Sequence, residues 1–243
     1  MNRTEPQSYQ VSESLPARIA AVIHSPRALF SRVIVRPEWA DLMALSFAVS
    51  LACGVVFMLT DVGRQALVDQ LERTALAFGQ DVDDAQYARF EQVSQNGVAY
   101  AALRALAAGP VLACGAAAVI FGLFTAAGRG EATYRQVLAV TVHAGVILAL
   151  RQVVAAPINY MRETLASPAT IGTFVPMLDE ASPAARFLGA IDLFVVWWLL
   201  VLAMGVALLY RRNARATAAA FVGAYVGFAV LLSIAMVVSG GTV

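Results

Sequence analysis

Three ionisable residues lie inside otherwise apolar stretches of this chain, where they could form a buried ion pair or bind an anion. They are Arg104, Arg151 and Asp192. Each falls about five or six residues inside a long apolar block, a depth of roughly 8–9 Å at the helical rise. An ionisable group in hydrocarbon is costly, so it usually faces the interior of a helix bundle and has a partner. We therefore expect these three side chains to form one polar layer near the outer side of the membrane.

The charge balance of this layer leaves two interpretations open. Two arginines and one carboxylate carry one excess positive charge, which Glu163 or Asp179 from the following linker could neutralise. Otherwise the layer could hold the head group of an anionic lipid or another anion. The alternative is a structural ion pair that fixes helix register, with the spare arginine extending toward the membrane surface.

His143 lies near the middle of another apolar block and is a secondary candidate. A histidine at this depth can transfer protons or bind substrate, although a single one more often hydrogen-bonds a neighbouring helix. The other histidine, His24, is distant in the sequence. We expect Cys53 and Cys114 to be small membrane-embedded residues. No HExxH, GxSxG, Walker A or CxxC motif is present. We therefore expect no enzymatic activity, cofactor or metal.

Five apolar blocks position these residues. A helix needs about 20 apolar residues to cross a bilayer, and 60% of this chain is hydrophobic. The blocks cover residues 41–60, 98–127, 136–157, 187–210 and 217–238. The sequence predicts an all-α integral membrane protein, with a five-helix membrane domain at residues 38–243.

Small residues and proline mark two of these blocks. Gly109-Pro110 should kink the second block, because proline removes a backbone hydrogen bond. Gly223 and Gly227 are four residues apart in the fifth block, a spacing that allows helices to approach closely. We expect this pair to contribute to helix packing.

The distribution of arginine predicts the orientation. Segments on one side of a five-span chain hold Arg3, Arg18, Arg27, Arg32, Arg36, Arg129, Arg135, Arg211, Arg212 and Arg215. The linkers on the other side hold Arg64, Arg73, Arg89, Arg162 and Arg186. By the positive-inside rule, the N-terminus is cytoplasmic and the C-terminus outside. The lack of lysine suggests a GC-rich bacterial genome, and the net charge of +1 gives no reason to expect nucleic acid binding. The expected location is a bacterial inner membrane.

The segment before the first block is predicted to be cytoplasmic and amphipathic. Residues 1–13 are expected to be a disordered tail, and residues 14–37 to form two helices separated at Ser25-Pro26. The second helix carries arginines beside apolar residues, and we expect their guanidinium groups to contact lipid phosphates. These arginines are Arg27, Arg32 and Arg36. The alternative is a pair of helices packed on the cytoplasmic end of the bundle.

The two outer linkers, residues 61–97 and 158–186, should be partly helical. In the first, Leu67, Leu71, Thr74 and Phe78 recur at helical spacing. Asp83 and Gln86 then have the spacing of a capping box, which predicts the start of a second short helix. Three prolines interrupt the second linker, where we expect short helical turns.

Several short motifs from residue 25 to the C-terminus resemble the Yip1 domain family of multi-spanning membrane proteins, in its bacterial branch. They are Ser25-Pro26-Arg27-Ala28-Leu29-Phe30, Arg36-Pro37-Glu38-Trp39, Gly128-Arg129-Gly130, Tyr134-Arg135-Gln136-Val137, and Asp192-Leu193-Phe194 continuing through Trp197 to Gly205. The resemblance implies five spans and a cytoplasmic N-terminus. Eukaryotic relatives are linked to vesicle traffic and small-GTPase binding, but their Asp-Leu-x-Gly-Pro motif survives here only as Asp41-Leu42.

Three functions therefore remain open. The first is a non-catalytic membrane adaptor or organiser in trafficking or transport, with an unknown membrane protein as partner. The second is a lipid- or small-anion-handling protein that uses the polar layer, and the third is a membrane-shaping protein that uses the amphipathic segment. The expected environment is the lipid bilayer, with anionic lipids and a second copy of the chain as further candidate partners.

Overall fold

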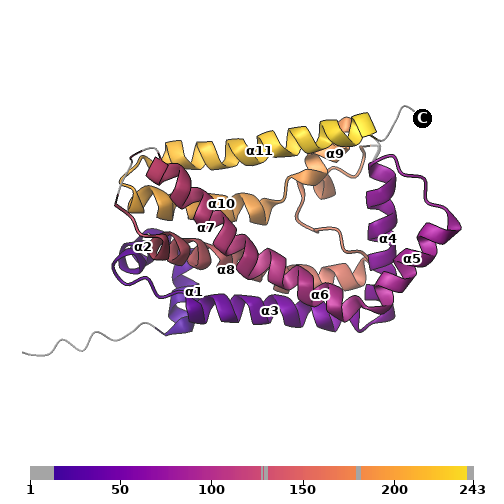
Figure 1. Cartoon of the computed structure of the whole chain (residues 1–243), viewed down its shortest axis with the longest axis horizontal. Helices are drawn as coiled ribbons and strands as arrows, with labels where there is room; N and C mark the ends of the chain where they lie inside the picture. Colours follow the sequence, from indigo (N-terminus) through magenta and orange to yellow (C-terminus); the bar gives the residue numbers. More distant parts are fainter. Residues whose placement is uncertain (1–13, 127, 129–130, 179–181, 240–243) are drawn as a thin grey trace, which may run out of the picture.

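The computed structural model describes residues 14–126, 128, 131–178 and 182–239. The expected tail at residues 1–13 lies outside them. The described residues form a bundle of helices (Figure 1) and contain no β-strand beyond an isolated bridge. The α-helices are α1 (Leu15–His24), α2 (Pro26–Val35), α3 (Ala40–Met58), α4 (Asp61–Ala77), α5 (Asp84–Gln95), α6 (Gly97–Leu106), α7 (Leu112–Ala126), α8 (Tyr134–Met161), α9 (Pro183–Ala190), α10 (Leu193–Leu209) and α11 (Ala214–Ser239).

Four helices in the described residues are long and apolar enough to cross a membrane. They are α3, α8, α11 and the continuous helix Gly97–Ala126, which includes α6 and α7. A π-helical segment, Ala107–Val111, joins α6 to α7 and contains Pro110, where the sequence predicted a kink. The all-α membrane class is thus confirmed. The count of five spans stays a prediction, because α10, in the fourth predicted block, is apolar but has only 17 residues.

The fourth predicted span, residues 187–210, is not one helix. α9 ends at Ala190, the backbone is extended at Ile191 and Asp192, and α10 begins at Leu193. Asp192 caps α10, so the break is built into the sequence at this acidic residue. Asp192 therefore precedes α10 instead of lying inside a helix.

α8 is the central helix of the bundle. Its most apolar stretch is 56% buried within the protein, against 11–17% for α3, α11 and the α6–α7 helix. Its start is fixed by a capping box between Thr133 and Gln136, and the Gln136 side chain also donates to the Ile34 carbonyl (2.9 Å). α8 therefore connects the membrane helices to the end of α2.

The α1–α2 segment packs on the bundle. Val22, Leu29 and Phe30 are buried among side chains of α8 and α10. Gly205 of α10 permits this approach, because a Cβ there would lie 2.5 Å from a Val140 methyl and 3.1 Å from the Phe30 ring. The apolar face of this segment is thus covered by protein, as in the alternative that the sequence left open.

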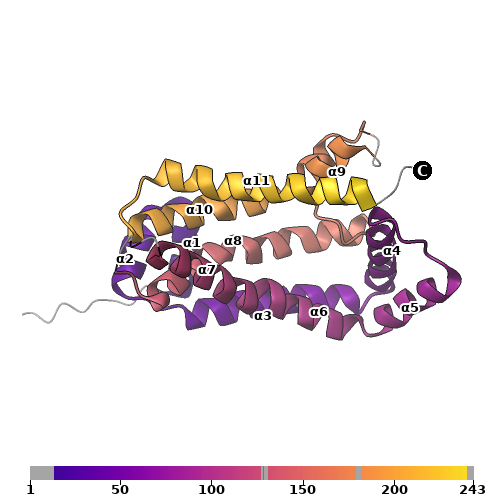
Figure 2. The same ribbon diagram turned by 45° about the horizontal axis from the view of Figure 1, so that its top comes forward.

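Different elements occupy the two ends of the bundle. α1, α2 and the turn between α10 and α11 lie at one end, whereas α4, α5 and α9 lie at the other (Figures 1 and 2). α4 crosses the end of the bundle, and α5 begins where Asp83 accepts a hydrogen bond from the Gln86 amide (2.7 Å), at the position that the spacing predicted. The first outer linker therefore folds into two helices.

Candidate functional site

Asp192 and Arg151 form an ion pair at the start of α10. The Arg151 Nε lies 2.9 Å from the Asp192 Oδ2, so the pair joins α8 to α10. The Asp192 side chain is 7% exposed and that of Arg151 25%. The buried carboxylate therefore faces an arginine that retains contact with the surroundings.

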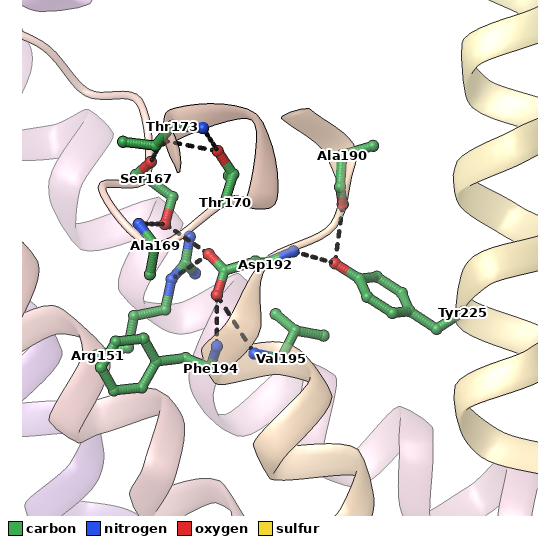
Figure 3. A network of polar contacts seen from close by, with 10 residues as sticks. All are labelled: Arg151, Ser167, Ala169, Thr170, Thr173, Ala190, Asp192, Phe194, Val195 and Tyr225. Atoms are coloured by element: carbon green, nitrogen blue, oxygen red, sulfur yellow. Dashed lines mark hydrogen bonds and ion pairs between the residues drawn. The ribbon is translucent and has the colours of Figure 1, made fainter. Parts of the chain in front are cut away.

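The remaining acceptor positions of Asp192 are also occupied (Figure 3). Its Oδ1 accepts hydrogen bonds from the backbone amides of Phe194 (2.8 Å) and Val195 (3.3 Å), and so caps α10. The Ser167 hydroxyl donates to Oδ2 at 2.5 Å. A buried charge is tolerated when it is paired and hydrogen-bonded in this way.

Two further segments are held to the same residue. The Tyr225 hydroxyl of α11 accepts a hydrogen bond from the Asp192 amide (3.0 Å) and donates to the Ala190 carbonyl (2.8 Å). On the other side, the backbone of Leu193 donates to Ala169 (2.9 Å) in the linker after α8. Asp192 thus joins α8, this linker, α10 and α11, an arrangement that we call the Asp192 network.

Both carboxylate oxygens of Asp192 have partners within the network. The network suits the structural ion pair that the sequence offered as one interpretation. It orients the outer linker and the start of α10 relative to α8.

Arg104 does not join the Asp192 network, so the structure brings together only two of the three residues of the predicted layer. Its side chain is exposed and, within the described ranges, has no hydrogen bond or ion pair. It lines a pocket of about 60 Å³ between α3, α6 and α8, together with Gln152 and Asn159. Gln152 lies next to Arg151 in the sequence, but successive helical residues point in different directions. The Arg104 pocket therefore lies at a different face of α8 from the Arg151 side chain.

Of the two acids proposed as neutralising partners, the structure describes only Glu163, which does not lie in the network. Glu163 is exposed, has a left-handed backbone (φ 51°) and has no side-chain partner in the part of the chain that the structure describes. Asp179 lies outside the described residues. Arg151 and Asp192 balance each other, so the network needs no second acid.

His143 is fully buried in α8. Its Nδ1 lies 2.7 Å from the Ala139 carbonyl, one turn earlier in the same helix, which assigns the proton to Nδ1. The Nε2 atom is buried without a hydrogen-bond partner among the described residues. The expected hydrogen bond to a neighbouring helix is therefore replaced by one within α8.

The expected helix-packing pair, Gly223 and Gly227, is exposed, and a Cβ at either would meet no atom within 4 Å among the described residues. α11 packs on α10 through other residues of the described part of the chain. The face that carries these glycines remains open to lipid or to a second copy.

The arginines expected to contact lipid lie on the outside of the α2 end. Arg27, Arg32 and Arg36 are all exposed, while Leu29, Phe30 and Val33 of the same helix are buried in the bundle. Their contact with lipid phosphates stays a prediction.

A second ion pair was missed in the sequence. Arg18 of α1 is buried and pairs with Asp41 in the first turn of α3, and Glu38 lies 3.9 Å away. One signal was available, since Arg18 lies on the apolar face formed by Leu15, Ile19 and Val22. Ser167 and Tyr225 had no comparable signal, because hydroxyl groups in linkers and apolar helices are common.

A comparison with family models identifies the chain over most of its length. The model described as the Yip1 domain matches residues 20–237. No curated protein and no solved structure matches this chain. The match includes every helix that is long and apolar enough to span a membrane, apart from the last residues of α11.

Proposed function

This chain belongs to the Yip1 domain family, and we propose that it acts as a non-catalytic adaptor or organiser in membrane trafficking or transport. The family and the long apolar helices make it a multi-pass membrane protein. Its proposed site is a bacterial inner membrane, with the α1–α2 end in the cytoplasm and the C-terminus outside, because most arginines cluster at the α1–α2 end.

α5 is the observation that carries the adaptor proposal. This helix has 12 residues, and only Ser94 is buried. Helices of this length are marginal in water unless one face packs against other structure. Arg89, Glu91 and Val93 are all exposed on α5. A surface of this kind at the end of the bundle is suited to a protein partner that packs on it.

Photo-crosslinking in the native membrane tests this proposal. A crosslinking amino acid in place of Arg89 should give one discrete protein adduct, identified by mass spectrometry. The control position is Phe228, which is 62% exposed on the apolar helix α11 and should give mainly lipid adducts. Lipid adducts alone at both positions, with the protein folded, would contradict an adaptor that uses α5.

The Arg104 pocket favours a second candidate function, the handling of a lipid or small anion. Arg104 has no protein partner among the described residues. Asn159 lines the same pocket, and its side-chain amide nitrogen carries two hydrogen-bond donors. A volume of about 60 Å³ is several times the roughly 10–15 Å³ that one water molecule needs in a cavity. A cation and an amide at such a pocket are suited to one small anionic group.

An anion-binding measurement separates this candidate from the adaptor. Inorganic phosphate and phosphatidic acid should each bind the purified protein, and Arg104→Gln should weaken both. Arg162→Gln is the matched control, because Arg162 is also exposed and lacks a side-chain partner in the described ranges. Equal binding by both variants would exclude the pocket as an anion site.

The membrane-shaping hypothesis finds less support. It requires the apolar face of residues 14–37 to enter the bilayer, and Val22, Leu29 and Phe30 are instead buried against the bundle. We therefore do not carry it forward.

A further inference from the structure

Four arginines from two separate segments line one open groove at the α2 end of the bundle. Arg27 comes from α2, whereas Arg211, Arg212 and Arg215 come from the turn between α10 and α11 and from the first turn of α11. The groove has a volume of about 520 Å³. We call it the arginine groove.

No acid of the described residues neutralises this groove. None of its four arginines has an ion pair or a side-chain hydrogen bond there, and all four are exposed. Two acids near the start of α3, Glu38 and Asp41, face Arg18 instead. The groove therefore presents a concentrated positive charge that attracts anions.

Helix ends explain some of these arginines but not all of them. Arg211 and Arg212 follow the C-terminus of α10, where the helix dipole favours positive charge. Arg215 lies in the first turn of α11, at the positive end of that dipole, and no acid is present in that turn. Arg27 belongs to a different segment. An anionic ligand would account for all four together.

The backbone of the turn fixes the position of these side chains. The Arg212 amide donates to the Ala207 carbonyl (2.7 Å) and the Arg211 amide to the Leu208 carbonyl (3.4 Å), which is the hydrogen-bond pattern of a Schellman motif. Arg211 has a left-handed backbone (φ 52°) at a position where glycine is usual. The side chain of Asn213 then caps α11. The turn therefore holds an arginine where glycine would adopt the backbone conformation at lower cost.

The walls of the groove match an amphiphile at a membrane surface. Its apolar part consists of Met204, Ala207 and Leu208 of α10. Since α10 ends and α11 begins here, the groove lies where these apolar helices reach the polar interface. We therefore expect the charged rim to lie at the depth of lipid phosphates and the apolar wall at the depth of the first acyl carbons.

We propose that the arginine groove binds the phosphodiester head group of an anionic glycerophospholipid, with the acyl chains against Met204 and Leu208. Arginine forms paired, charge-assisted hydrogen bonds to phosphate oxygens. Basic pockets of this kind at membrane surfaces suit anionic lipid head groups. The proposal is independent of the adaptor function and of the Arg104 pocket.

Native mass spectrometry of the full-length protein, titrated with phosphatidylglycerol, tests the proposal. Each arginine near the surface contributes about fivefold in affinity, so Arg212→Gln with Arg215→Gln should weaken binding roughly 30-fold. The matched control removes two exposed arginines from the other end of the bundle, Arg89→Gln with Arg162→Gln. It should change binding less than about threefold, because salt screens charges at that distance from the groove. Arg212→Lys with Arg215→Lys preserves charge and should lose only part of the affinity. This variant replaces the glutamine variant if the latter does not fold.

Four outcomes would overturn the proposal. Equal weakening in groove and control variants would indicate general attraction by charge. Equal binding of phosphatidylcholine would exclude recognition of the anionic head group. Displacement of the lipid by inorganic phosphate would identify a soluble phosphate ligand, and an equal loss with Arg104→Gln would assign the lipid to the Arg104 pocket.

Discussion

Two arginine–aspartate pairs stand at opposite ends of the bundle, and the buried partner differs between them. Arg18 and Asp41 join α1 to the start of α3, while Arg151 and Asp192 join α8 to the start of α10. In the first pair the arginine side chain is 9% exposed and the aspartate 45%. In the second, the arginine is 25% exposed and the aspartate 7%.

The difference shows what each buried charge requires. Asp192 has an ion pair, a serine hydroxyl and two backbone amides as partners. Arg18 has two acids beside it, but its buried Nε lacks a hydrogen bond within the described residues. Asp192 is satisfied in part by backbone donors at a helix start, whereas the two charged partners of Arg18 are both side chains. The two pairs should therefore respond differently to loss of the aspartate.

Asp192→Ala should give the largest effect. It removes the cap of α10 and leaves Arg151 unpaired, which we expect to lower the free energy of unfolding by about 3–5 kcal/mol. Thermal unfolding in detergent, followed by size-exclusion chromatography, measures the change. Asp192→Asn keeps an acceptor for the cap, so its free energy of unfolding should lie between those of Asp192→Ala and the wild type. A loss below about 1 kcal/mol for the alanine variant would show that the network contributes little.

Asp41→Ala should cost less, about 1–2 kcal/mol, because Asp41 is half-exposed and Glu38 can approach Arg18 in its place. The same unfolding measurement applies. A double-mutant cycle with Glu38→Gln should reveal this compensation as a combined loss larger than the sum of the single losses. A cost equal to that of Asp192→Ala would remove the distinction between the pairs.

Tyr225→Phe tests the outermost contact of the Asp192 network. It removes hydrogen bonds to the Asp192 amide and the Ala190 carbonyl, for an expected loss of about 0.6–1.5 kcal/mol. Tyr160→Phe is the matched control, since Tyr160 is 51% exposed and its hydroxyl has no partner in the described part of the chain. Equal unfolding temperatures for both variants would place Tyr225 outside the network energetically.

The sequence predicted the two central residues of the Asp192 network but not its form. Arg151 and Asp192 stand out because charges are rare in apolar blocks. The apolar run across residues 187–210 concealed the helix break, since hydropathy does not distinguish a residue inside a span from one that caps it. The preference of aspartate for helix starts was the available signal. The contacts with Ser167 and Tyr225 depend on tertiary structure, which no local pattern encodes.

The same limit explains the other differences. Block lengths predicted most of the apolar helices, because the bilayer sets a length that composition reveals. The role of the α1–α2 segment was left open, because an amphipathic face suits a bundle as well as a bilayer. Gly223 and Gly227 have the spacing of a packing pair, but spacing does not say which chain or lipid faces them.

Arg104→Gln should have the smallest effect on stability, within about 0.5 kcal/mol of the wild type. Arg104 is an arginine of an apolar helix like Arg151, but it is exposed and has no partner among the described residues, so its loss leaves no charge unpaired. Arg151→Gln is the matched comparison, and it should destabilise measurably because Asp192 loses its counter-charge. The unfolding temperatures of the two variants, measured in the same detergent, test this difference. A loss of stability for Arg104→Gln as large as that for Arg151→Gln would contradict this distinction. It would mean that Arg104 and Arg151 contribute to stability together, although they lie at different faces of α8.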